Sequence, residues 1–222
     1  MIPPTQNEEF VAHMEDILEL YHRPFDPECP LICMDEQPIQ LIGETRIPIP
    51  ATINHPEIID YEYKRNGTAN IFMFTEPLNS WRNATIRITK TKNDWALEIK
   101  ELLDVYYPNV NKVILICDNY STHTIGAFYA TFSPEEASRL LKRLEIHYTP
   151  KHGSWLNIAE CELSALTRQC LDRRMGDLET LEREVNFWKV KRNDLQKGVD
   201  WQFTTDDARI KLKRLYPQIK AS

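Results

Sequence analysis

The 222-residue chain lacks long apolar runs and the features of a secreted protein. No stretch approaches the roughly 18 uncharged apolar residues that a membrane-spanning helix requires. The amino-terminal segment Met1-Ile2-Pro3-Pro4 has neither the basic region nor the apolar core of a signal peptide. These absences predict a cytoplasmic protein.

Paired cysteines and an excess of positive charge are also missing. The five cysteines are an odd number, no Cys-x-x-Cys pair occurs, and Cys33 and Cys117 lie inside apolar segments. These features favour reduced, mostly buried thiols over a zinc site. The formal net charge is −6, whereas proteins that coat nucleic acid neutralise its phosphates with lysine and arginine. Any DNA contact must therefore come from local basic patches or from a part of the protein outside this chain.

The chain does have enough apolar residues for a core. Hydrophobic residues make up 42% of it, which suits one sizeable α/β domain. Apolar side chains at helical spacing predict an amphipathic helix over residues 7–22, and the run 31–34 predicts a first buried strand. Asn66-Gly67 stands between two strand-like runs, which predicts a hairpin turn. The antiparallel meander that results comprises the runs 59–63, 69–74 and 84–88.

The second half of the chain alternates strands with helices. A helix is expected from Asn93, as its N-cap, to the residues before Pro108. Ser133-Pro134-Glu135-Glu136 is a capping box with proline at the first helical position, and it predicts a helix to about residue 144. The other predicted elements are strands 113–117 and 146–148 and helices 154–173, 178–195 and 205–215. This order predicts an α/β, ribonuclease-H-like fold, with helices flanking a mixed five-stranded sheet and a helical C-terminal end.

Acidic residues close two of the predicted strands. Asp35 follows one apolar run, Asp118 follows another, and Glu160 lies on a later helix. An aspartate at the end of a buried strand either caps a turn or lies in the crevice where α/β sheets bind ligands. Two such aspartates and a helix-borne glutamate together indicate a carboxylate metal site. Glu162 lies close to Glu160, and the apolar periodicity of the helix does not choose between them.

The segments around these carboxylates resemble a known family. The third catalytic motif of DDE transposases, in the bacterial insertion-sequence branch of the mariner-like superfamily, resembles Tyr148-Thr149-Pro150-Lys151-His152-Gly153-Ser154-Trp155-Leu156-Asn157-Ile158-Ala159-Glu160. The first two motifs of that branch resemble Met34-Asp35-Glu36-Gln37-Pro38-Ile39-Gln40 and Asp118-Asn119-Tyr120-Ser121-Thr122-His123. The resemblance extends to residues 61–70, 165–174 and 201–209, so it covers almost the whole chain.

The resemblance implies an enzyme that hydrolyses DNA phosphodiesters at transposon ends and transfers the freed 3′-hydroxyl to target DNA. It implies two Mg²⁺ ions per site, for which Mn²⁺ can substitute. Asp35 would bridge the ions, Asp118 would bind one of them, and Glu160 would complete the other. The family glutamate stands three positions after an asparagine, which selects Glu160 after Asn157 and leaves Glu162 as a surface or ion-paired residue.

The partners implied are transposon-end and target DNA and a second copy of the protein in a synaptic complex. Neither a membrane nor a small-molecule substrate is expected, and the bacterial protein would associate with the nucleoid when bound to DNA. Glu36 points to the other side of its strand from Asp35, where it would support the site or the fold. The candidate DNA contacts are Lys64, Arg65, His123, Lys151 and His152, with Arg173-Arg174 as a further pair. For the two histidines, a hydrogen-bonded structural role is an equal alternative.

Two departures from the family pattern bear on function. Complete transposases carry amino-terminal helix-turn-helix modules, whereas only about 30 residues precede Asp35. We therefore expect a catalytic domain alone, with residues 1–30 as a helical lead-in and 31–222 as the catalytic unit. Many relatives also carry lysine where Gln37 stands.

The alternatives to an active transposase domain are a decayed or domesticated transposase that acts as a non-catalytic binding factor, and a related enzyme that cuts RNA in a hybrid. The 42-position interval from Asp118 to Glu160 is longer than in mariner elements, and we expect the surplus in the helix capped by Ser133.

Overall fold

The computed structural model describes residues 5–217, so Met1-Ile2-Pro3-Pro4 lies outside the described residues. Its centre is a five-stranded mixed sheet in the order β3-β2-β1-β4-β5. The first three strands are antiparallel, whereas β4 is parallel to both β1 and β5. The strands are β1 (Leu31–Glu44), β2 (Tyr63–Glu76), β3 (Trp81–Arg87), β4 (Val113–Cys117) and β5 (Leu144–Tyr148). The predicted fold class is confirmed.

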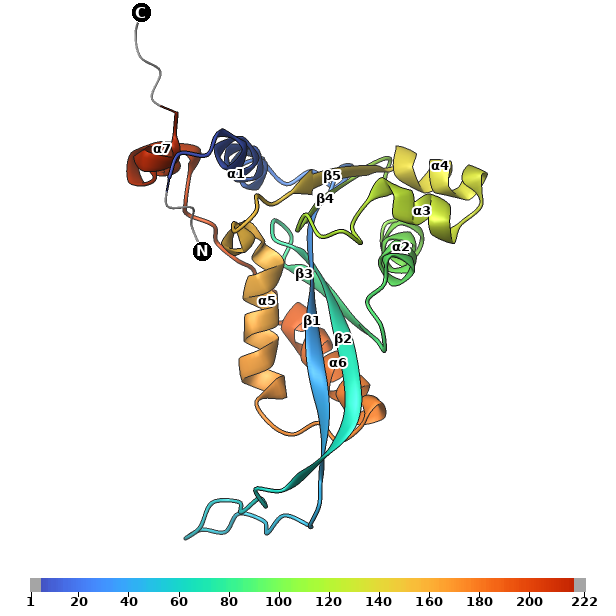
Figure 1. The fold of residues 1–222 in the computed structure, drawn as a ribbon, viewed down its shortest axis with the longest axis vertical. Coiled ribbons are helices and arrows are strands. Elements are labelled where there is room, and N and C mark those ends of the chain that lie inside the picture. Colours follow the sequence, from blue (N-terminus) through green and yellow to red (C-terminus); the bar gives the residue numbers. More distant parts are fainter. Residues whose placement is uncertain (1–4, 218–222) are drawn as a thin grey trace, which may run out of the picture.

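Helices cover both faces of the sheet and enclose two cores (Figure 1). Alternate residues of a strand point to opposite faces, so Cys33 and Ile116 belong to one core and Ile32 and Leu115 to the other. The helices α1 (Glu8–Tyr21), α5 (Ile158–Leu166) and α6 (Leu178–Asp194) cover the first core, and α2 (Lys92–Glu101), α3 (Ile125–Thr131) and α4 (Pro134–Lys142) cover the second. α7 (Thr205–Lys211) packs beside α1.

The starts of α1 and α4 agree with the sequence, whereas the start of α2 does not. Ser133 caps α4 as predicted, with its hydroxyl accepting a bond from the Glu136 N–H. α2 begins one position before the expected N-cap, because Thr91 and Asp94 form a reciprocal capping box there and leave Asn93 inside the helix. α1 begins near its expected position, behind Asn7. Part of the long Asp118 to Glu160 interval forms α3, which the sequence analysis missed.

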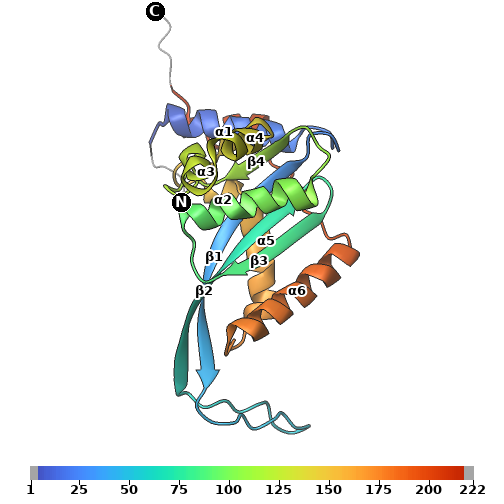
Figure 2. The same ribbon diagram turned by 90° about the vertical axis from the view of Figure 1, so that its right-hand side faces the viewer.

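Asn66-Gly67 is not a hairpin turn, which corrects the prediction from the sequence. β2 continues through both residues, and the pairing with β1 shifts at this point. Two residues therefore face Leu41, which is a β-bulge, and Gly67 takes the positive φ of +103° that glycine allows. The chain reverses instead in residues 45–62, at the tip of a long arm that extends beyond the body of the sheet (Figure 2).

The longer helices predicted near the C-terminus are divided in the structure. Residues 154–173 form a 3-10 turn η2 (Ser154–Leu156), then α5, then a π-helical segment η3 (Thr167–Leu171). Residues 205–215 form α7 and a short η4 (Lys213–Leu215), whereas α6 occupies its predicted range. Among residues 5–217, no helix is long and apolar enough to cross a membrane. All five cysteines are free thiols, of which Cys33 and Cys117 are buried and Cys161 is exposed.

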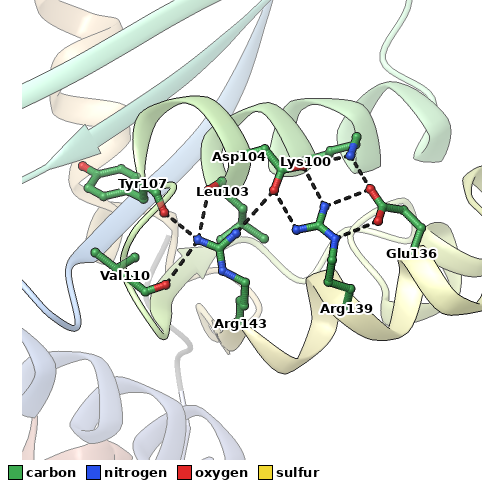
Figure 3. A network of polar contacts seen from close by, with 8 residues as sticks. All are labelled: Lys100, Leu103, Asp104, Tyr107, Val110, Glu136, Arg139 and Arg143. Carbon is green, nitrogen blue, oxygen red and sulfur yellow. Dashed lines mark hydrogen bonds and ion pairs between the residues drawn. The ribbon is translucent and has the colours of Figure 1, made fainter.

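A network of charges holds α4 against α2 and the π-helical segment η1 (Leu102–Tyr106) (Figure 3). The Arg139 guanidinium lies between the carboxylates of Asp104 and Glu136, and Lys100 contacts both carboxylates. Arg143 donates to backbone carbonyls at the end of η1 and in the loop after it, which belong to Leu103, Tyr107 and Val110. These bonds satisfy carbonyls that a helix end leaves without partners. The network holds together the helices that cover the sheet face opposite α5.

Candidate active site

The register of the parallel strands brings Asp35 and Asp118 side by side. Residues 31–33 of β1 pair with residues 114–116 of β4. The two aspartates keep this same offset, just beyond the paired segment. Both also alternate with residues of the core beneath α5, because Leu31 and Cys33 on one strand and Ile114 and Ile116 on the other belong to that core. The Asp35 carboxylate therefore points toward the face that α5 covers, whereas the Asp118 carboxylate, beyond the end of β4, contacts His123.

Asn157 attaches the start of α5 to the first half of β1. Its buried side-chain amide donates to the Met34 carbonyl at 2.8 Å and lies 3.4 Å from Asp35 Oδ2. The amide oxygen of the same side chain accepts a bond from the Ala159 N–H at 3.1 Å and so caps the helix. Glu160 follows in the first turn. The contacts of Asn157 thus hold that first turn beside Asp35, a role that the sequence analysis did not assign to it.

The segment that precedes α5 is fixed from two sides. The Tyr21 hydroxyl of α1 donates to the Leu156 carbonyl at 2.6 Å and accepts from the Ile158 N–H at 3.4 Å. On the other side, the Gly153 N–H donates to the Pro150 carbonyl at 2.8 Å and closes a turn. A Cβ atom on Gly153 would lie only 2.5 Å from Pro150 Cγ, so the tight turn requires glycine.

The three carboxylates share one electrostatic environment. Burial raises the pKa of Asp35 to about 7; the Glu36 N–H opposes the shift, and the charges of Asp118 and Glu160 add to it. The Asp118 side chain is 43% exposed, and Glu160 is exposed on α5. Within residues 5–217, no three histidine, cysteine, aspartate or glutamate side chains stand close enough to hold a metal ion as they are placed. The structure therefore gathers the three residues without closing them into a ligand cluster.

His123 is a buried residue, which corrects its prediction as a DNA contact. Its ring is 2% exposed, with Nδ1 2.7 Å from Asp118 Oδ1 and Nε2 2.9 Å from Glu36 Oε1. Burial lowers the pKa of His123, but the bonds to Asp118, Cys117 and Glu36 outweigh it and raise the pKa to about 12. The ring also stacks on Trp95, with 5.3 Å between ring centroids. No face of the imidazole is left for a phosphate.

The side chain of Glu162 belongs to a buried ion-pair cluster. Its side chain is 1% exposed and accepts bonds from Arg192 at 2.6 Å and 2.9 Å. Arg82 Nε, equally buried, lies 3.1 Å from the same carboxylate. Glu160 is the exposed glutamate at this end of α5. Glu162 is thus the ion-paired residue that the sequence allowed for.

The predicted basic contacts lie in two places. Lys151 and His152 are exposed in the turn before α5, where His152 has a positive φ of +67°. Lys64 and Arg65 are exposed on the arm. Arg65 pairs with Ile42, seven positions beyond Asp35 on β1, or roughly 23 Å along the strand. The arm residues are therefore remote from the carboxylates. Arg173 and Arg174 are paired with Glu184 and Glu44.

A hollow of about 210 Å³ lies between α1 and the loops that follow β4 and β5. Its lining includes Lys151 and Asn119, the residue that follows Asp118, and it also includes His13 of α1, which the sequence analysis did not single out. The remaining lining residues are Asn7, Glu9, Phe10, Thr149 and Pro150.

A family model described as DDE superfamily endonuclease matches residues 30–182, a range that includes all three carboxylates. The chain belongs to this family. The predicted family is thus confirmed, whereas the chain's place in the bacterial insertion-sequence branch stays a prediction. A search of curated proteins found no match.

Solved structures with a similar fold come from the Mos1 transposase. The Mos1 mariner paired end complex with Mn superposes with a TM-score of 0.58 at 16% identity, over 88% of this chain and 59% of that one. The Mos1 Strand Transfer Complex gives 0.60 at 15%, over 88% and 59%. The paired end complex with Mg gives 0.54 at 14%, over 98% and 66%. At these identities the likeness establishes the fold alone, and the chain spans about three fifths of the length of the first Mos1 chain.

Proposed function

We propose that this chain is the catalytic domain of a DDE transposase, which hydrolyses DNA phosphodiesters at transposon ends and transfers the 3′-hydroxyl into target DNA. The observation that carries the proposal is the position of Asp35 and Asp118, which lie side by side just beyond the parallel pairing of β1 with β4, with the first turn of α5 and its Glu160 held beside Asp35. The ends of such strands are where α/β sheets hold ligands. Membership of the endonuclease family supports the same three residues.

The carboxylates suit a pair of Mg²⁺ or Mn²⁺ ions. All three side chains are oxygen donors, which hard divalent cations prefer. The raised pKa of Asp35 means that its pocket opposes further negative charge, and a cation would relieve this. Glu160 is exposed enough to turn toward an ion held at Asp35, and the Asp118 side chain is 43% exposed. Bound there, the ions would activate water and offset the charge that develops on the scissile phosphate.

The remaining residues would orient the ligands and the DNA. Asn157 holds the first turn of α5 beside Asp35, which brings Glu160 within reach. Lys151, which lines the hollow together with Asn119, and the exposed His152 beside it would contact the backbone of the cleaved strand. Lys64 and Arg65 on the arm would contact DNA farther from the cleavage point. The Mos1 structures with this fold are paired end and strand transfer complexes, which supports DNA ends as substrate and assembly with a second copy.

The proposal is tested by a nicking assay on transposon-end DNA with Mg²⁺ or Mn²⁺, run beside an RNA–DNA hybrid. Asp35→Asn, Asp118→Asn and Glu160→Gln each remove an anionic ligand and keep its shape, so each should abolish cleavage and leave the fold intact. Glu182→Gln, on the exposed side of α6, is the matched control and should cleave normally. Cleavage of the hybrid alone would favour a ribonuclease. A folded chain that cuts neither substrate and does not bind Mn²⁺ would favour a non-catalytic binding factor.

A further inference from the structure

His123 forms a bridge between the strands that carry the two aspartates. On one side its Nδ1 lies 2.7 Å from Asp118 Oδ1. On the other, its Nε2 lies 2.9 Å from Oε1 of Glu36, whose side chain is 5% exposed. Glu36 directly follows Asp35 on β1, and neighbouring strand residues point to opposite faces. The bridge therefore connects Asp118 to the strand that holds Asp35, through the face of the sheet that lies away from α5.

We propose that His123 is a positioning residue that holds the Asp118 carboxylate for metal binding, and that Glu36 holds the His123 ring. This inference rests on the function proposed above. Asp118 lies in a loop beyond the end of β4, and its side chain is partly exposed. His123 Nδ1 lies 3.2 Å from the Asp118 backbone carbonyl oxygen and 2.7 Å from Oδ1 of the same residue. The contact with this one carboxylate oxygen restricts the rotation of the side chain and leaves Oδ2 for an ion. A ligand that is already oriented loses less freedom when the ion binds.

The surroundings of His123 fix the ring as well as the loop. The Tyr148 hydroxyl donates to the His123 carbonyl at 2.7 Å, and the His123 N–H donates to the Tyr120 carbonyl at 3.0 Å. The imidazole stacks on Trp95 of α2. Burial of a histidine and a glutamate in a core is costly compared with apolar side chains of similar size. If the residue at this position had only a structural role, an apolar side chain would stabilise the core better. Orientation of Asp118, in contrast, requires a hydrogen-bond donor.

Two neutral substitutions separate the two bonds. An asparagine places its amide near Nδ1, so His123→Asn keeps a donor for Asp118 and loses the bond to Glu36. A glutamine reaches toward Nε2, so His123→Gln keeps a donor for Glu36 and loses the bond to Asp118. Both variants remove the imidazolium charge, so a difference between them reports the orientation of Asp118 and not the charge beside it.

The test is calorimetric titration of Mn²⁺ into the full 222-residue chain without DNA, together with thermal unfolding of each variant. We expect His123→Gln to bind Mn²⁺ about 10-fold more weakly than His123→Asn, although both should unfold at similarly lowered temperatures. Glu36→Gln keeps an acceptor for Nε2 and should disturb the fold less than His123→Gln does. It should weaken Mn²⁺ binding a few-fold. If His123→Gln does not fold, Glu36→Gln tests the positioning role in its place.

Equal Mn²⁺ affinities in the two His123 variants, or an unchanged affinity in Glu36→Gln when His123→Gln is unfolded, would overturn the positioning role and leave the proposed function standing. Failure of the unsubstituted chain to bind Mn²⁺ would instead overturn the proposed function, and the role of His123 with it. Asp35→Asn distinguishes these cases, because it should lose Mn²⁺ binding whatever His123 does.

Discussion

Replacement of Glu162 by glutamine should destabilise the protein strongly, although the residue is not a metal ligand in our proposal. Glu162 and Arg82 are each 1% exposed, and Arg192 binds the same carboxylate. The substitution keeps the shape of the side chain but leaves two guanidinium groups near each other without a counter-charge. Removal of one partner of a buried ion pair costs about 3–5 kcal/mol. For a chain of this length, that loss lowers Tm by roughly 10 °C.

The assay is urea or thermal unfolding, with Glu182→Gln as the matched surface control. The double variant Arg82→Met with Glu162→Leu should recover part of the loss, because apolar side chains can replace a buried pair at little cost. The sequence left Glu162 as a surface or ion-paired residue, and its burial beside Arg82 and Arg192 makes it ion-paired. A free energy of unfolding within about 1 kcal/mol of the control would refute the reasoning from the buried cluster.

Three further predictions concern the site itself. The folded chain retains the Asp35 proton up to about pH 7, whereas the unfolded chain releases it near its ordinary pKa of 3.8, so stability should fall as pH rises through that window, by at most on the order of 4 kcal/mol. Urea unfolding at pH 4 and pH 7.5 should therefore show Asp35→Asn to be increasingly more stable than the unsubstituted chain at the higher pH, and an advantage independent of pH would count against it. Gly153→Ala should lose about 1–3 kcal/mol in the same assay, because its Cβ would meet Pro150, and an unchanged stability would show that the turn can relax. Fluorescence anisotropy in EDTA should detect only weak, sequence-independent binding of duplex DNA that falls steeply with salt, and the binding should rise when Mn²⁺ replaces EDTA; tight, selective binding in EDTA would reveal a DNA-reading element in this chain.

The fold could be predicted where a local pattern and the tertiary structure agree. The apolar runs that end at Asp35 and Asp118 are the two central parallel strands, and Ser133 caps its helix as its motif indicates. Asn66-Gly67 misled the prediction because the dipeptide suits a bulge as well as a turn, and only the pairing partner distinguishes them. Thr91 replaced Asn93 as N-cap because the capping box adds a second bond that one N-cap residue alone does not supply.

Part of the site, like part of the fold, could be predicted from the sequence. The positions of the three acidic residues follow from the ends of two apolar runs and from the family motif, all of which are visible in the sequence. The burial of His123 could not be predicted in this way, because its partner Glu36 is 87 positions away and Trp95 lies on α2. The ion pairs of Glu162 likewise involve Arg82 and Arg192, which no helical periodicity could place beside it.

The most direct test is the position of Mn²⁺ in crystals of the chain grown or soaked with the ion, located by anomalous diffraction. We predict manganese between Asp35 and Asp118, with carboxylate oxygens of both at about 2.0–2.3 Å and Glu160 turned in from α5 as a ligand. Manganese bound elsewhere with these three carboxylates left without metal, or a site that excludes Glu160, would contradict the proposed catalytic centre.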